Sequence, residues 1–289
     1  MIVRGHERIL VQGITGTQAT FWTERMQAYG TDVVAGVNPK KAGIIHCGVP
    51  VYASATSAAA DLELDVSVIL VPPFSVKAAA IDAIEAGVPK LVIVTEHVPI
   101  KDVMYLLAAA RDAGTRVVGP NTAGLVTPGE CFVGLMPAFE ASIFQPGPIG
   151  VVSRSGSLGT LICLNIVGAG FGESAFIGVG GDPIIGTTTR DALEMLDGDD
   201  RTQAIVLVGE IGGAMEERAA ESAYGIAKPI IAFIAGRASP SETRMGHAGA
   251  IVLGDKGSYA SKHRALTRAG VSVLDTPSEV GPALQEVLQ

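Results

Sequence analysis

Short apolar runs alternate with helical stretches along the whole chain. In the first half, the runs that predict strands are Ile9–Val11, Val33–Val37, Val66–Val71, Leu91–Val94 and Val117–Val118. In the second half they are Ile149–Ser153, Ser174–Ile177, Ala204–Val208, Ile230–Ile234 and Val271–Leu274. Runs that are apolar at successive positions indicate strands buried on both faces. Their alternation with helices predicts an α/β protein with mainly parallel sheets.

A segment without clear periodicity divides the chain. Residues 127–148 contain Pro128, Pro137, Pro146 and Pro148 together with several glycines, a composition typical of a connection. We therefore expect one domain over residues 1–126, a linker over 127–148 and a second domain over 149–289. The length of 289 residues agrees with this division, since one domain usually takes about 100–200 residues.

Charge and composition exclude several classes of partner. The net charge is −8, aromatic residues make up 5% and no run of Lys and Arg occurs, so we expect neither nucleic acid nor an anionic membrane as partner. Cys47, Cys131 and Cys163 are far apart and lack metal-ligand spacing, which indicates reduced thiols and no metal site. With neither a signal peptide nor a long apolar run, the chain is expected to be cytoplasmic.

The loop after the first predicted strand has the anatomy of a phosphate-binding turn. The stretch Gln12–Ala19 reads QGITGTQA, a strand end, a glycine turn and a helix start, where free backbone N–H groups bind anions. The dinucleotide spacing G-x-G-x-x-G is absent, so a plain turn that needs glycine is the alternative. Lys40 and Lys41 follow the second predicted strand. They form either a solvated loop or a clamp for an anion on the glycine turn.

A second junction of this kind follows the strand at Ile149–Ser153. The sequence Arg154-Ser155-Gly156-Ser157 is rich in small residues and precedes a predicted helix, which again favours anion binding at the helix start. The nucleophile motif G-x-S-x-G is not satisfied, and this argues against a serine hydrolase.

A histidine between glycines is the main candidate for chemistry. The stretch Met245–Ala250 reads MGHAGA, and its small residues leave the imidazole of His247 open as a nucleophile. Glu210 ends a predicted strand between glycines, where its carboxylate would accept the N–H of His247 and fix the tautomer. The alternatives are a histidine in a tight turn and an exposed loop acid.

Eight motifs in matching order resemble the α subunit of succinate–CoA ligase (succinyl-CoA synthetase). The resemblance extends from about residue 9 to the C-terminus. The motifs are Gln12–Gln18, His46–Val51, Gly119–Asn121, Thr127–Glu130, Ser153–Gly156, Gly180–Pro183, Gly209–Gly213 and Met245–Ala250.

The resemblance implies a Rossmann-like CoA-binding domain followed by a flavodoxin-like ligase domain. It also implies the α subunit of a nucleoside-diphosphate-forming acid–CoA ligase, which joins CoA to a small carboxylic acid. Its expected partner is an ATP-grasp β subunit, in a heterodimer or heterotetramer, that binds ATP or GTP with Mg²⁺. The implied chemistry combines an acyl phosphate, a phosphoryl group carried on a histidine and attack of CoA on the acyl carbon.

The resemblance assigns roles to residues of this chain within each matching motif. By this resemblance His247 is the phosphorylated nucleophile, and Glu210 orients it. The residues expected to bind CoA are Thr15, Gly16, Thr17, Gln18, Lys41, Val94, Thr95 and Glu96. Those expected to face the acid or the phosphate are Asn121, Ser155, Gly156, Ser157 and Thr160.

The chain departs from the family pattern where the acid is expected. Thr160 and Leu161 stand where the succinate enzymes have tyrosine and glutamate, and Thr122-Ala123 replaces cysteine-proline. The smaller, less polar helix start favours an acid larger than succinate or differently substituted, such as malate or a sulfonated acid.

Two other functions fit parts of the sequence. One is a CoA-binding sensor with an inactive ligase half, which the intact His247 and Glu210 oppose. The other is a dinucleotide oxidoreductase. This requires an acidic residue at the end of the second strand, where the chain reads Val37-Asn38-Pro39.

Overall fold

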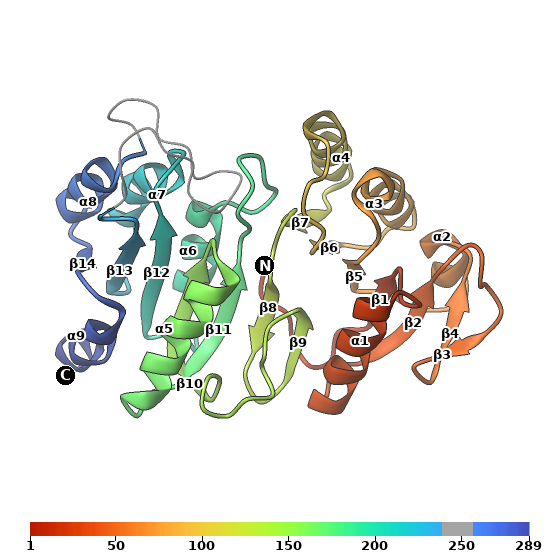
Figure 1. The fold of residues 1–289 in the computed structure, drawn as a ribbon, viewed down its shortest axis with the longest axis horizontal. Helices are drawn as coiled ribbons and strands as arrows, with labels where there is room; N and C mark the ends of the chain where they lie inside the picture. The colour runs from red at the N-terminus through yellow and green to blue at the C-terminus, as the bar shows by residue number, and fades with distance from the viewer. Residues whose placement is uncertain (239–256, 289) are drawn as a thin grey trace.

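The computed structural model describes residues 1–238 and 257–288. Within these residues the chain forms two seven-stranded sheets that lie side by side (Figure 1). All but three of the strand pairings are parallel. The predicted α/β class with mainly parallel sheets is therefore confirmed.

The first sheet has the order β3-β4-β2-β1-β5-β6-β7. Its strands are β1 (Ile9–Gln12), β2 (Val33–Val37), β3 (Ile45–His46), β4 (Val49–Tyr52), β5 (Val66–Ile69), β6 (Lys90–Ile93) and β7 (Arg116–Val118). Every residue of β1 and β5 is buried, as the uninterrupted apolar runs predict. The chain reverses its direction of winding at β1, between β2 and β5, and such a point opens a crevice at the carboxyl ends of the strands.

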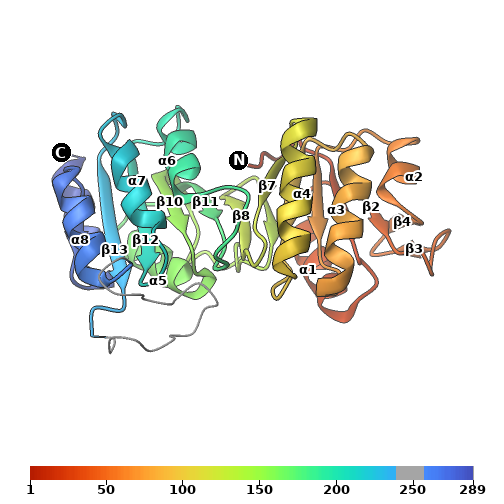
Figure 2. The same ribbon diagram turned by 90° about the horizontal axis from the view of Figure 1, so that it is seen from above.

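Helices cover both faces of this sheet. Helix α1 (Thr17–Tyr29) lies on one face, and α2 (Ala55–Ala59), α3 (Val76–Glu85) and α4 (Ile100–Ala113) lie on the other (Figures 1 and 2). Both α1 and α4 end at a glycine in the left-handed region, Gly30 at φ 115° and Gly114 at φ 74°, which accepts this conformation without a Cβ clash. A short 3₁₀ turn (Pro73–Ser75) precedes α3.

The second sheet has the order β14-β13-β12-β10-β11-β8-β9, in which β8 and β9 are antiparallel. Its strands are β8 (Gly124–Thr127), β9 (Cys131–Gly134), β10 (Pro146–Ser153), β11 (Glu173–Gly178), β12 (Ala204–Glu210), β13 (Ile230–Ala235) and β14 (Ser272–Leu274). Its helices are α5 (Gly156–Gly168), α6 (Thr189–Asp197), α7 (Met215–Ala223), α8 (Tyr259–Arg268) and α9 (Val280–Val287), the last preceded by a 3₁₀ turn at Pro277–Glu279.

These helices also form two layers. Helices α6, α7 and α8 share one face and contact one another, whereas α5 and α9 pack together on the opposite face (Figure 1). Seen from above, α8, α7, α6, α4 and α3 follow one another along the molecule (Figure 2). In the described part of the chain, no helix is both long and apolar enough to cross a bilayer.

The segment expected to be a linker contributes to the second sheet. β9 lies within residues 127–148, and β8 runs into the start of this segment. Phe132 of β9 exchanges hydrogen bonds with the Thr31 hydroxyl at 2.8 and 3.1 Å and packs against Trp22 and Tyr29. The apolar core of the second sheet therefore continues onto α1 of the first unit.

Candidate functional site

A cavity of about 1070 Å³ opens at the carboxyl ends of β1, β2 and β5. Thr15, Gly16, Thr17 and Gln18 line one wall of it, and Lys41 lines another. The structure thus brings together five of the residues that the sequence predicts for CoA. They surround the N-terminus of α1, at the crevice where the winding direction of the sheet reverses.

Glycine and asparagine shape this loop. Gly13 has a φ of +85°, and a Cβ there would lie 2.8 Å from the carbonyl oxygen of Leu70, so the turn requires glycine. Asn38 joins the two walls, since its amide nitrogen donates to the Thr15 hydroxyl at 2.6 Å. Its oxygens accept the backbone N–H groups of Lys40 and Lys41, at 2.9 and 3.0 Å.

The donor set of this cavity suits a diphosphate. Helix α1 has thirteen residues, no acidic residue in its first turn and no side chain that caps its N-terminus. Its first backbone N–H groups therefore have no partner within the helix, and the residues that carry them, Thr17, Gln18 and Ala19, line the cavity. Two lysines, Lys40 and Lys41, lie on the opposite wall with exposed side chains. The residues present fit the phosphate groups of CoA.

A second cavity, of about 590 Å³, lies between the two halves. Val94, Thr95 and Glu96 line it from the first half, together with Pro73, while Asn121 and Gly156 line it from the other side. The three residues predicted for CoA after β6 are therefore grouped with predicted acid-site residues, away from the glycine turn. Pro72 lines the first cavity, and the next residue, Pro73, lines the second.

The start of α5 forms one end of the second cavity. Ser155 caps the helix by accepting the N–H of Leu158 at 3.4 Å, and its hydroxyl also contacts that of Ser157 at 3.3 Å. The N–H groups of Gly156 and Ser157 have no acceptor within the helix. A Cβ at Gly156 would lie 2.7 Å from the Ala123 methyl, so close packing requires glycine here.

The positions where the sequence departs from the succinate pattern separate in space. Thr122 and Ala123 line the second cavity. Thr160 and Leu161 do not belong to its lining. The Thr160 hydroxyl donates to the carbonyl of Gly156 at 2.8 Å, and the Leu161 side chain is 40% exposed on α5. Of the four departures, only the first two line this cavity.

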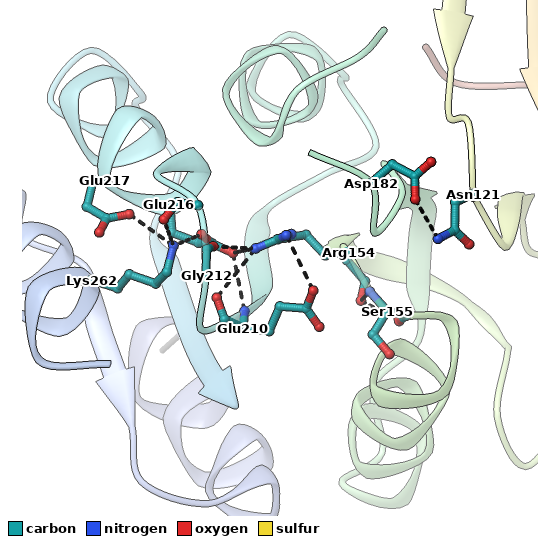
Figure 3. Close-up of polar contacts among 11 residues, drawn as sticks. Asn121, Arg154, Ser155, Asp182, Glu210, Gly212, Glu216, Glu217 and Lys262 are labelled. Atoms are coloured by element: carbon teal, nitrogen blue, oxygen red, sulfur yellow. Dashed lines mark hydrogen bonds and ion pairs between the residues drawn. The ribbon is translucent and has the colours of Figure 1, made fainter. Parts of the chain in front are cut away.

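Asn121 is oriented by the second half of the chain. It adopts a φ of +57°, which asparagine tolerates better than most residues, and its amide nitrogen donates to Asp182 at 2.9 Å (Figure 3). Its backbone N–H donates to the carbonyl of Thr95 at 3.0 Å. These contacts hold Asn121 at the junction of the two halves.

Glu210 is the last residue of β12 and is 7% exposed. The Nη2 of Arg154 lies 3.4 Å from its Oε1, and the Nη1 of Arg154 contacts Glu216 Oε1 at 3.3 Å (Figure 3). Lys262 of α8 in turn donates to both Glu216 and Glu217. The carboxylate that the sequence singles out therefore belongs to a buried cluster of opposite charges.

The sequence does not predict three members of this cluster as site residues: Arg154, Glu216 and Lys262. In a helix, Glu and Lys usually belong to the solvated face, so Glu216 and Lys262 carry no local signal of burial. One signal exists at Gly209, where a Cβ would lie 2.9 Å from the Glu216 carboxylate. A glycine inside an otherwise apolar strand indicates such close approach by another group.

His247 lies in residues 239–256, outside the described residues. On either side of that segment, the described chain passes close to Glu210. Before it, Ala235 of β13 pairs with Glu210 of β12. After it, the carbonyl of Gly257 accepts the N–H of Gly212 at 2.8 Å. On either side of that segment, the described chain therefore contacts the end of β12 or the turn after it, at Glu210 and Gly212.

Comparisons with known proteins agree with this architecture. Residues 5–97 match the family model described as CoA binding domain, and residues 152–272 match the one described as CoA-ligase. The chain is 44% identical to subunit alpha 2 of the ADP-forming succinate–CoA ligase of Archaeoglobus fulgidus, over 100% of this chain and 99% of that protein. It is 41% identical to the ADP-forming sulfoacetate-CoA ligase subunit SqwL of an Acholeplasma species, over 97% and 95% of the two chains.

A solved structure extends the comparison. ATP citrate lyase from Methanosaeta concilii, in complex with (3S)-citryl-CoA, superimposes with a TM-score of 0.89 at 25% identity. The match covers 99% of this chain and 50% of the lyase chain, so this chain spans about half of that protein's length. With full-length identity above 40% to two ligase subunits, the chain belongs to the CoA-ligase family whose members include the α subunits of ADP-forming succinate–CoA ligases.

Proposed function

We propose that this chain is the α subunit of an acid–CoA ligase that acts through a phosphohistidine at His247. The observation that carries the proposal is the place of Glu210, buried at the end of β12, where Ala235 pairs with it and Gly257 accepts the N–H of Gly212, two residues further on. A carboxylate there is suited to accept one imidazole N–H and leave the other nitrogen as nucleophile.

The proposed reaction has three transfers. The imidazole nitrogen of His247 takes the γ-phosphoryl group of a nucleoside triphosphate and releases the diphosphate. The acid's carboxylate oxygen then takes the phosphoryl group from the nitrogen and becomes an acyl phosphate. The CoA thiolate attacks the acyl carbon, and phosphate leaves. The nucleotide and Mg²⁺ are assigned to an ATP-grasp β subunit, a partner supported by the α-subunit relatives.

The two cavities suit the two remaining substrates. The larger one offers the α1 amides and Lys41 to the CoA phosphates, and the consecutive residues Pro72 and Pro73 line the larger and the smaller cavity. The smaller one would take the reacting end of CoA and the acid, with the α5 amides as donors to a phosphate or carboxylate.

The acid is proposed to be succinate or a related dicarboxylic acid. A substituted acid, such as malate or a sulfonated acid, is the alternative. It is supported by Thr122 and Ala123 in the cavity lining, which replace the cysteine and proline of the succinate pattern. A relative named as a sulfoacetate–CoA ligase subunit supports it too.

Labelling with γ-³²P nucleotide tests the proposed function. We expect the αβ complex with Mg²⁺ to acquire acid-labile, alkali-stable label, as a phosphoramidate does, and the His247→Asn variant to acquire none. His263 of α8 provides a matched control, since His263→Asn should label normally. Label that persists in His247→Asn would refute the phosphohistidine. A wild-type complex without label, yet with tight CoA binding, would favour the non-catalytic CoA-binding sensor.

A negative charge at the start of α1 is expected to weaken CoA binding. Replacing Gln18 with aspartate places a carboxylate beside the phosphate-binding amides, and we expect CoA to bind about 5- to 20-fold more weakly. Isothermal titration calorimetry measures this. The control is Gln203→Asp, the same change on an exposed loop of the other half. Equal affinities of the two variants would contradict the assignment of CoA phosphates to this cavity.

A further inference from the structure

A buried group of charges supports Glu210 from the side of α7 and α8 (Figure 3). The side chains of Arg154, Glu216 and Lys262 are 1%, 0% and 0% exposed. Burial of such charges carries an unfavourable desolvation free energy that offsets much of their mutual attraction. Packed apolar side chains therefore often stabilise a fold to the same extent. A fixed orientation of the charged groups, however, is something that apolar packing does not provide.

Glu216 connects this group to the main chain of Glu210. Its Oε1 accepts both the Arg154 guanidinium at 3.3 Å and the backbone N–H of Glu210 at 3.2 Å. Its Oε2 accepts the ammonium of Lys262. The same carboxylate therefore fixes the end of β12 and the guanidinium that faces the Glu210 side chain.

Backbone carbonyls fix the orientation of the Arg154 guanidinium through its Nη1 atom. Its Nη1 donates to the carbonyl of Gly212 at 3.0 Å, and the carbonyl of Glu210 lies within 3.5 Å of the same nitrogen. With Nη1 held in this way, the planar guanidinium presents Nη2 to the Glu210 carboxylate at 3.4 Å. A lysine ammonium is a point charge and cannot serve both positions at once.

Lys262 fastens the group to α8. Besides Glu216, its Nζ contacts Glu217 Oε2 and the carbonyl of Gly213, both at 3.0 Å. The other carboxylate oxygen of Glu217 accepts the N–H of Gly257 at 3.1 Å. Charges from three separate elements thus converge on the turn that follows β12.

We propose that Arg154 is a positioning residue for Glu210, and that Glu216 and Lys262 hold its guanidinium in the required orientation. Arg154 also lines the second cavity, but its side chain is only 1% exposed, and we assign it a role through the carboxylate of Glu210. The inference rests on the proposed function, because its effect appears in the phosphoryl transfer that Glu210 serves.

A double-mutant cycle on the αβ complex tests this role. We expect Arg154→Lys to slow phosphoenzyme formation about 10- to 100-fold while the KM for the nucleotide changes less than about twofold. In a Glu210→Gln background, the same change should slow the reaction by less than about twofold, because the residue it positions is already lost. Lys262→Gln should show the same non-additivity, and it serves as a second probe if Arg154→Lys folds poorly.

Arg4→Lys is the matched control. Arg4 pairs with Asp199 at 2.5 Å and lines neither cavity, so its replacement should leave the rate unchanged in both backgrounds. Unchanged CoA affinity shows that each variant is folded. If the effects of Arg154→Lys and Glu210→Gln multiply, Arg154 is merely structural and the proposal is overturned. A wild-type complex that forms no phosphoenzyme would overturn both this inference and the proposed function.

Discussion

Replacing Glu210 with glutamine is expected to slow phosphoenzyme formation about 10²- to 10⁴-fold with little change in fold. Glutamine has nearly the same size, so the end of β12 should keep its packing. It lacks the negative charge that we propose accepts an imidazole N–H and that balances the Arg154 guanidinium 3.4 Å away. Its amide would also leave a buried arginine without one of its two carboxylate partners.

Rapid-quench measurement of labelled α subunit gives this rate directly. The control is Glu194→Gln, the same substitution on the exposed side of α6, where Glu194 pairs only with Arg190 within its own helix. That variant should react at the wild-type rate. If Glu210→Gln acquired label as fast as the control, Glu210 could not be the residue that orients the histidine.

Stability is expected to fall as the pH rises from about 5 to 8, because of one buried acid. Glu173, the first residue of β11, is 1% exposed, and burial raises its pKa from 4.5 to about 8. The Gln145 N–H and the Cys163 thiol each oppose this rise in part. The folded chain therefore holds a proton that the unfolded chain releases above pH 4.5.

The direction of this pH dependence of stability follows from the difference in protons bound by the folded and unfolded states. Between the unfolded pKa of 4.5 and the folded pKa of about 8, the folded state binds more protons, so rising pH favours unfolding. The stabilisation from the protonated Glu173 carboxyl is complete below pH 4.5 and is lost as the pH rises to about 8. For a shift of this size, the loss is about 2–5 kcal/mol.

Glu173→Gln should remove this pH dependence, because glutamine stays neutral. We expect urea unfolding to give the variant a higher free energy of unfolding than wild type at pH 9, and a smaller difference at pH 5. Glu63→Gln provides the control, since the Glu63 side chain is 95% exposed. If wild type and Glu173→Gln respond alike to pH, the Glu173 carboxyl is ionised in the folded chain.

Strands with an apolar run were predictable, including the three-residue edge strands β7 and β14, and four strands without such a run were not. The runs that predict β1, β2, β5, β6, β10, β11, β12 and β13 are buried in the sheets. β3 has two residues, β4 contains a proline, and β8 and β9 each have a glycine at one end. A run of two residues, or one interrupted by glycine or proline, shows no clear period, and these strands form because neighbouring strands supply their hydrogen bonds.

The sequence by itself determined the fold class, the glycine turn before α1 and the strand-end position of Glu210, because each depends on contacts between near neighbours in the chain. Only the tertiary structure decided the surroundings of Glu210. Arg154 follows β10, Glu216 lies on α7 and Lys262 lies on α8, and their burial together depends on how these elements pack. It also separated Thr122, at the cavity, from Thr160, whose hydroxyl is bound to its own helix. A local pattern specifies a residue's conformation, whereas its partners are set by packing across the fold.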